Sequence, residues 1–110
     1  MNESSLNEIE AKIRGADNLS KERKRELLQL LGTLKTEVGK LSQTHDEEAQ
    51  SIAGFAQLSA HEATRAQRNP QSLHYSLEGL RSSVEGFEKS HPRLVQIVNN
   101  ISNTLANLGI

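Results

Sequence analysis

The second half of the chain carries a long apolar stripe whose members are spaced by alternating steps of four and three residues. The stripe consists of Leu73, Leu77, Leu80, Val84, Phe87, Leu94, Val98, Ile101, Leu105 and Leu108. His91 stands in its one gap, at the position where the next apolar residue would fall. Such spacing is typical of the buried seam between helices that pack side by side at a shallow angle. The stripe therefore predicts an all-α, coiled-coil-like fold.

A second stripe with the same spacing lies in the first half. It consists of Leu27, Leu31, Leu34, Val38 and Leu41, followed by His45 and then by Ala49, Ala53, Ala56, Ala60 and Ala63. Two successive steps of four around His45 shift the stripe by one residue, which indicates a local irregularity. Thr44 and Glu47 could cap a new helix at this point. Because no glycine or proline occurs nearby, we expect instead one long helix over residues 20–67, roughly 70 Å in length.

Asn69-Pro70 predicts the start of a returning arm, because asparagine can accept a backbone N–H and proline suits the first helical position. Pro92 interrupts this arm while the stripe continues past it with unchanged spacing. The proline either follows a cap that begins a new helix or kinks a single helix. We expect two nearly collinear helices over residues 70–90 and 92–108, with a kink at Pro92.

A short amphipathic helix is predicted over residues 5–14, because Ser5 and Glu8 fit a capping box. Its apolar face consists of Leu6, Ile9 and Ile13. A helix this short is unstable alone and must dock on the rest of the chain. Ser20 is expected to cap the long helix, and Gly109 in the terminal Leu-Gly-Ile is expected to end the last one.

We expect the two arms to form a long antiparallel helical hairpin that folds back near residues 68–69. In this arrangement the irregularity at His45 falls level with Pro92 on the other arm, so that His45 lies close to His91. Two independent irregularities at one level support the pairing. The whole chain, residues 1–110, is then a single helical domain.

The composition fits a thin helical bundle and excludes several classes of protein. Hydrophobic residues make up 35% of the 110 residues and aromatic residues 3%, too few for a thick globular core. The formal charge of −1 disfavours a general binder of polyanions. Without cysteine there are no disulfides and no thiolate metal sites. The sequence contains no apolar run long enough to span a bilayer and no signal peptide, which makes a cytoplasmic location the default expectation.

A lone hairpin buries little, because each helix hides only one stripe and the ordering of its backbone is costly. Several apolar residues lie off the two stripes and are candidates for an interface. They are Leu28, Leu30, Ile52, Phe55, Leu58, Val95 and Ile97. We therefore expect a homo-oligomer, most simply a dimer of hairpins that forms a four-helix bundle. The function expected from this surface is that of a structural or adaptor protein with a further, unidentified protein partner.

The histidines are the only side chains with the potential to form a chemical site. His45 and His91 together with Asp46, Glu47 and Glu88 could hold a divalent metal, or could make association depend on pH. Their more ordinary interpretation is a helix cap or a hydrogen-bonded filler of the seam. His61 and His74, about one turn apart in the hairpin, form a weaker candidate of the same kind. We expect no metal and no other cofactor.

A basic cluster runs from Lys21 to Arg25 and could bind nucleic acid or an anionic membrane surface. Glu22 and Glu26 dilute the cluster, and no aromatic residues accompany it for base stacking, so a solvated helix face is favoured. The sequence contains no glycine-rich phosphate loop, no cysteine nucleophile and no Ser/His/Asp arrangement in a motif. A non-enzymatic protein is therefore expected.

The C-terminal half also resembles a known family. The run from Ser83 to Leu94, with its Phe-Glu-x-x-His-Pro core, together with His61-Glu-Ala-Thr-Arg65 and the Leu-Gly-Ile terminus, is similar to a family of short bacterial proteins catalogued as a domain of unknown function. The resemblance covers about residues 60–110 and is vaguer over the first 45. It implies a small helical protein and brings no activity, cofactor or site residues.

Overall fold

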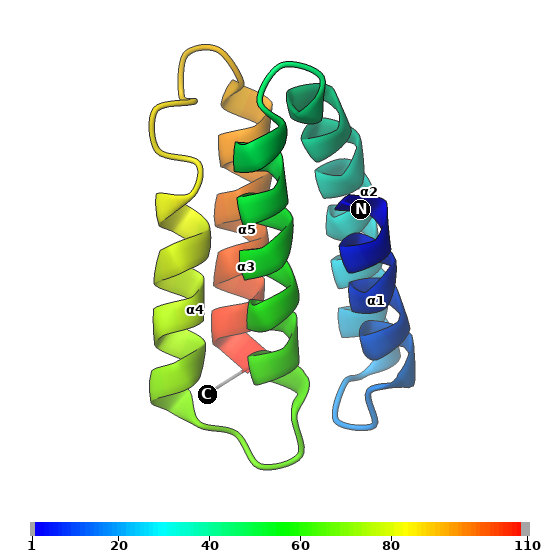
Figure 1. The fold of residues 1–110 in the computed structure, drawn as a ribbon. Coiled ribbons are helices and arrows are strands. Elements are labelled where there is room, and N and C mark those ends of the chain that lie inside the picture. Colours follow the sequence, from blue (N-terminus) through cyan, green and yellow to red (C-terminus); the bar gives the residue numbers. More distant parts are fainter. Residues whose placement is uncertain (1, 109–110) are drawn as a thin grey trace.

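The computed structural model describes the backbone of residues 2–108 and the side chains of residues 5–108. The described residues form five helices and no strand, which confirms the all-α class. The helices are α1 (Asn2–Gly15), α2 (Lys21–Ser42), α3 (Asp46–Thr64), α4 (Pro70–Ser82) and α5 (Pro92–Leu108). Helices α2 to α5 run alternately up and down as an antiparallel bundle, and α1 packs against α2 and α3 (Figure 1).

The predicted helix starts at Ser20 and Asn69 are confirmed. The Ser20 hydroxyl accepts a hydrogen bond from the backbone N–H of Arg23 at 3.1 Å. The Asn69 side chain accepts from the N–H groups of Gln71 and Ser72, and Pro70 is the first helical residue. Each cap satisfies N–H groups that have no partner within the helix.

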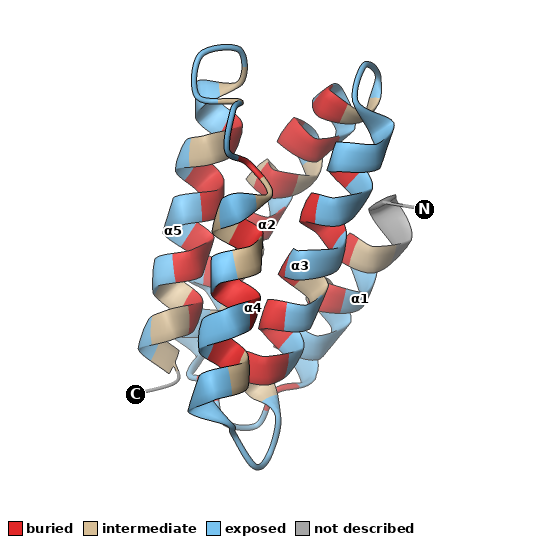
Figure 2. Cartoon of the chain, turned by 60° about the vertical axis from the view of Figure 1, so that its left-hand side comes forward, coloured by how far each residue is buried: buried red, intermediate tan, exposed pale blue. Residues whose placement is uncertain are grey.

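Both apolar stripes face the interior of the bundle, as predicted (Figure 2). Their apolar members are buried, apart from Phe87 and Leu108, which are half-buried, whereas His45 in the first stripe is exposed. The apolar face of the short N-terminal helix is buried as well, with Leu6, Ile9 and Ile13 all below 5% exposed. The helix itself begins earlier than residue 5, at Asn2.

The prediction of one helix over residues 20–67 is wrong, because α2 ends at Ser42 and the chain reverses before α3. The longest dimension of the molecule is 37 Å, about half of the expected hairpin. His45, with φ −137° and ψ 65°, leaves the helical conformation and stands as the N-cap of α3. Three carboxylates follow in the first turn, where the helix dipole favours negative charge. The Thr44 hydroxyl contacts the Leu41 carbonyl and His45 Nδ1, so it does not form the capping box considered for it.

The returning arm also differs from the prediction. Helix α4 ends at Ser82 rather than near residue 90, and α5 runs back antiparallel to it instead of continuing in line (Figure 1). Gly86 lies in the connection with φ +94°, a conformation that other residues rarely adopt, and this permits the reversal. Pro92 thus begins a new helix and does not kink an existing one. The expected stop at Gly109 lies outside the described residues.

The two reversals lie at the same end of the bundle, so the antiparallel pairs expected from the hairpin remain in contact. Helix α2 packs against α5, and α3 packs against α4. Folding the hairpin in half creates a four-helix interior within a single chain. Ile52 and Ile97, which were expected at an interface, are therefore core residues at 0% and 6% exposed.

Candidate functional site

Three large apolar side chains remain exposed on the face formed by α3 and α4. Phe55 and Leu58 on α3 are 38% and 46% exposed, and Tyr75 on α4 is 63% exposed. We call these three residues the apolar strip. Of the other residues expected at an interface, Leu28, Leu30 and Val95 are half-buried against the core.

Gly79 on α4 allows Phe55 to lie across the junction of the two helices. A Cβ atom added to Gly79 would stand 2.4 Å from Cε1 and 2.6 Å from Cδ1 of the Phe55 ring. No real Cβ comes this close to another atom, so the ring occupies space that only glycine leaves free. Sequence reasoning missed this contact, because an isolated glycine in a helical pattern gives no indication of its neighbour.

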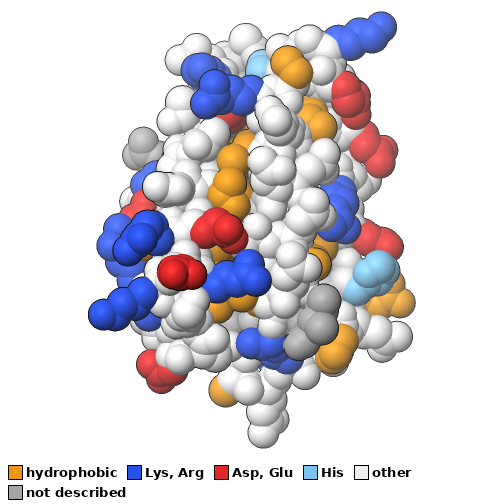
Figure 3. Space-filling view, turned by 180° about the vertical axis from the view of Figure 1, so that it is seen from behind, with side chains coloured by type: hydrophobic (Ala, Val, Ile, Leu, Met, Phe, Trp, Pro, Cys, Tyr) orange, Lys and Arg blue, Asp and Glu red, His pale blue; other side chains and the backbone are white. Residues whose placement is uncertain are grey.

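The helix that carries Phe55 and Leu58 is acidic. From Asp46 to Thr64, α3 carries four carboxylates and no lysine or arginine. By contrast, α2 carries six basic residues and three glutamates. In the view from behind, several lysine and arginine side chains lie along the left edge of the molecule, and others are spread over the rest of this face (Figure 3). Helix α2 is therefore basic and α3 acidic, although the net charge of the chain is close to zero.

The prediction that His45 lies near His91 is confirmed. Their ring centroids are 6.4 Å apart, and the ring of Phe87 lies 5.4 Å from His45 and 5.7 Å from His91, with all three rings edge to face. His45 is exposed and His91 is half-buried. Their Nδ1 atoms contact the neighbouring hydroxyls of Thr44 and Ser90, at 2.8 and 3.0 Å. The three rings join the α2–α3 connection to the α4–α5 connection, and we call them the ring cluster.

The ring cluster offers a metal only two donors, because its third member is a phenylalanine. The nearby carboxylates have partners elsewhere: Asp46 accepts from Gln50 at 2.8 Å, and Glu88 accepts from the backbone of Gly86 at 3.0 Å. Among residues 5–108 no three His, Asp or Glu side chains are grouped in a way that could hold a metal ion. A stable protein zinc site takes three or four ligands.

The second histidine pair and the basic cluster lie at the surface of the bundle, and several of their members contact neighbouring groups. His74 pairs with Glu78 at 2.7 Å and lies beside Tyr75, while His61 is exposed. In the basic cluster, Arg23 pairs with Glu26 at 3.5 Å. The Lys24 ammonium donates to the backbone carbonyl of Arg14 at 2.9 Å, which satisfies the C-terminal end of α1.

One buried carboxylate was not singled out from the sequence. Glu37 on α2 is only 7% exposed at its side chain and lies 3.5 Å from the Lys40 ammonium and 3.8 Å from the Arg93 guanidinium. It thereby links α2 to the start of α5. Two shallow clefts of about 500 and 470 Å³ adjoin this ion pair on the α2–α5 face. Their lining includes threonine, glutamine and asparagine side chains but no nucleophile activated by a neighbouring base.

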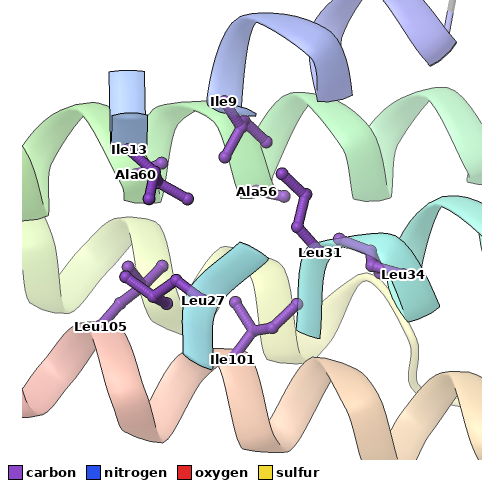
Figure 4. A pocket seen from close by; sticks show the side chains of 9 residues that line it. All are labelled: Ile9, Ile13, Leu27, Leu31, Leu34, Ala56, Ala60, Ile101 and Leu105. Atoms are coloured by element: carbon purple, nitrogen blue, oxygen red, sulfur yellow. The ribbon is translucent and has the colours of Figure 1, made fainter. Parts of the chain in front are cut away.

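An apolar cavity lies where α1 meets the rest of the bundle (Figure 4). It is lined by Ile9, Ile13, Leu27, Leu31, Leu34, Ala56, Ala60, Ile101 and Leu105. Its volume of about 10 Å³ is at the lower limit for a single water, and its wall provides no polar group to bind one. The cavity is a packing gap and cannot serve as a substrate site.

Comparisons with known proteins add a family and no activity. Neither the curated proteins nor the solved structures contain a match to this chain. No helix in the described part of the chain has the length and apolar character needed to cross a membrane. A family model described as "Domain of unknown function (DUF4404)" matches residues 27–110, which is more than half of the chain. The resemblance noted from the sequence is therefore confirmed, and the chain belongs to this family.

Proposed function

We propose that the protein is a non-enzymatic helical adaptor that binds an amphipathic, basic helix of a partner protein through the apolar strip. The observation that carries this proposal is the exposure of Phe55, Leu58 and Tyr75 together on two adjacent helices. Large aromatic and aliphatic side chains concentrate the binding energy of protein interfaces. A partner helix that lies along the α3–α4 face would cover all three.

The charge of the face sets the chemistry of the partner. Because α3 has four carboxylates and no lysine or arginine, a helix with lysine or arginine beside its apolar stripe gains attraction that an acidic helix lacks. This mode of recognition, in which an amphipathic helix lays its apolar side on a hydrophobic surface, is common among adaptors.

The proposal can be tested with two designed peptides of about 18 residues, long enough to form a helix. Both carry leucines in the same amphipathic pattern, and the polar face is lysine in one and glutamate in the other. We expect the lysine peptide to bind, with affinity that falls as salt is added. Leu58→Ser should weaken its binding about tenfold, as expected for a central apolar contact. Fluorescence anisotropy of the labelled peptide measures both effects.

The matched control is Leu28→Ser, since Leu28 is a half-buried leucine on α2 and lies outside the apolar strip. Equal loss of binding in the Leu28 and Leu58 variants would refute the proposal, as would equal binding of the two peptides. If Leu58→Ser instead dissolved a dimer of the protein, the strip would be a contact between copies. Self-association and a cytoplasmic location remain predictions. The dimer of hairpins was expected because apolar residues off the two stripes needed burial, and the interior of the single chain already buries two of them, Ile52 and Ile97.

A second candidate function rests on the ring cluster. Protonation of His45 and His91 would place two positive charges about 6.4 Å apart, at the N-terminal ends of α3 and α5. Helix dipoles disfavour cations at these ends. Asp46, Glu47, Glu48 and Glu88 lie nearby in sequence and oppose this effect, whereas Lys40, Lys89 and Arg93 add to it.

We propose that acidification weakens the contact between the two connections, because it would place like charges side by side in the ring cluster. The measurement is the free energy of unfolding of the wild type and of His45→Gln/His91→Gln at pH 7.5 and 5.5. The wild type should lose more stability than the double variant over this interval. Equal losses would eliminate the ring cluster as a pH-responsive element.

A further inference from the structure

We propose that α1 is an exchangeable helix and that the groove between α2 and α3 also accepts the α1 of a second copy. Two chains would then trade their first helices and form a dimer. This contact is separate from the apolar strip on α3 and α4. It provides a specific route to the self-association expected from the sequence.

The groove is shaped for an amphipathic helix. Leu6, Ile9 and Ile13 of α1 are nearly completely buried in it. Ile9 and Ile13 reach the central cavity, opposite Leu27 and Leu31 of α2 and beside Ala56 and Ala60 of α3 (Figure 4). Alanines on α3 leave room for another helix to approach closely. Without α1, these core side chains would be open to solvent.

Polar contacts make the groove selective for the sequence of α1. The Lys35 ammonium donates to Asn7 Oδ1 and to Glu10 Oε1, both at 2.8 Å, from its position on α2. Gln57 on α3 donates to the Glu8 carboxylate. An unrelated amphipathic helix would lack this set of acceptors. A second copy of the chain supplies all of them, so it is the occupant that the groove fits best.

The boundaries of the family match separate the groove from the helix that fills it. The match begins at Leu27 and includes the groove residues of α2 and α3, whereas α1 lies outside it. Helix α1 has 14 residues and is joined to α2 by residues 16–20. A helix of this length is marginal by itself, so it depends on the groove for its stability. The swapped dimer repeats the contacts of the monomer, so the main cost of exchange is the entropy of association.

The pair formed by Glu10 and Lys35 provides a complementation test in the full chain. In Glu10→Lys and in Lys35→Glu, α1 and its own groove carry like charges. If the two variants are mixed and exchange α1, the introduced lysine meets the introduced glutamate, and the native pair re-forms in the other groove. We expect the mixed dimer to exceed either self-dimer about tenfold, since each restored, partly exposed pair is worth roughly a factor of three. Native mass spectrometry with one variant ¹⁵N-labelled distinguishes the species.

The matched control is a mixture of the wild type with Glu10→Lys/Lys35→Glu. Within each of these chains, residues 10 and 35 carry opposite charges. Exchange of α1 between the two chains would bring like charges together at these positions, so we expect no excess of mixed dimer. Circular dichroism establishes that each single variant is folded. If one is unfolded alone, recovery of its helicity on mixing is the corresponding readout. A mixture of the single variants that forms no more mixed dimer than the control would overturn the proposal.

A second measurement identifies the occupant. Full-length Ile9→Asp has a weakened α1, and a fluorescent peptide of residues 2–15 serves as the probe. We expect this peptide to bind saturably, and the same peptide carrying Ile9→Asp not to bind. Peptide capture without any mixed dimer would refute the second copy as the occupant and would indicate a helix from another protein. Because Glu10, Lys35 and Ile9 lie outside the apolar strip, failure here leaves the adaptor proposal to its own test.

Discussion

Replacing Gly79 by alanine should have two opposing effects on the free energy of unfolding. Alanine is favoured over glycine in a helix interior by about 1 kcal/mol, and Gly79 lies within α4. The new Cβ, however, would stand 2.4 Å from the Phe55 ring, so the ring must move outward. Complete burial of a phenylalanine is worth about 1.5–3 kcal/mol. Because Phe55 is 38% exposed already, displacing it further should cost about 1 kcal/mol.

We therefore expect Gly79→Ala to leave the free energy of unfolding nearly unchanged in the wild type. In a Phe55→Ala background the ring is absent, and the same substitution should stabilise the protein by the full ~1 kcal/mol. The coupling energy of the double-mutant cycle should then be about 1 kcal/mol, which exceeds the deviation usual for independent sites. Urea unfolding followed by circular dichroism at 222 nm measures all four proteins. Equal stabilisation in both backgrounds would refute the contact between Gly79 and Phe55.

Three further predictions concern the bundle. Ser59→Ala and Ser102→Ala should leave the free energy of unfolding unchanged or raise it by up to about 1 kcal/mol, because the two buried hydroxyls have no hydrogen-bond partner within the described residues. A decrease of more than about 1 kcal/mol in urea unfolding would contradict this. Leu34→Asp should abolish cooperative thermal unfolding, since it buries an unpaired charge at a position 1% exposed; a sharp transition would contradict the core assignment. The hydrogen bond from Lys35, followed by that from Arg14, holds the pKa of Glu10 below its usual value. Its stabilisation should therefore be present at pH 7 and decline as the pH falls through that lowered pKa, so Glu10→Gln should reduce Tm most at pH 7 and progressively less as the pH is lowered. A reduction that does not change with pH would contradict this.

The sequence predicted two helix starts and the composition of the core correctly. Ser20 and Asn69 cap helices as expected, because their side chains satisfy backbone donors whatever the tertiary fold. The stripes are buried because their spacing matches the helical repeat. The proximity of His45 to His91 was also predicted, since it depends only on which segments lie level with each other.

The candidate site was predicted only in part. Phe55 and Leu58 were among the residues expected at an interface and are exposed, whereas Tyr75 was not considered. The contact of Phe55 with Gly79 and the burial of Glu37 beside Arg93 depend on how separate helices approach each other. Contacts between helices leave no repeating pattern of residues along the chain, so the pattern within one helix does not predict them.

The reversal at His45 shows which sequence feature distinguishes a long extended hairpin from a hairpin that is folded in half into a four-helix bundle. Both arrangements bury the same stripes and place the same irregularities at one level, so neither observation separates them. They differ in the apolar residues that lie off the stripes. An extended hairpin leaves Ile52 and Ile97 in water, and folding the hairpin in half buries both within the chain. A second copy could bury them too, but only at the entropic cost of association. Excess apolar residues of this kind therefore favour folding back over dimerisation wherever the chain can turn, and Thr44-His45 demonstrates that neither glycine nor proline is required for that turn.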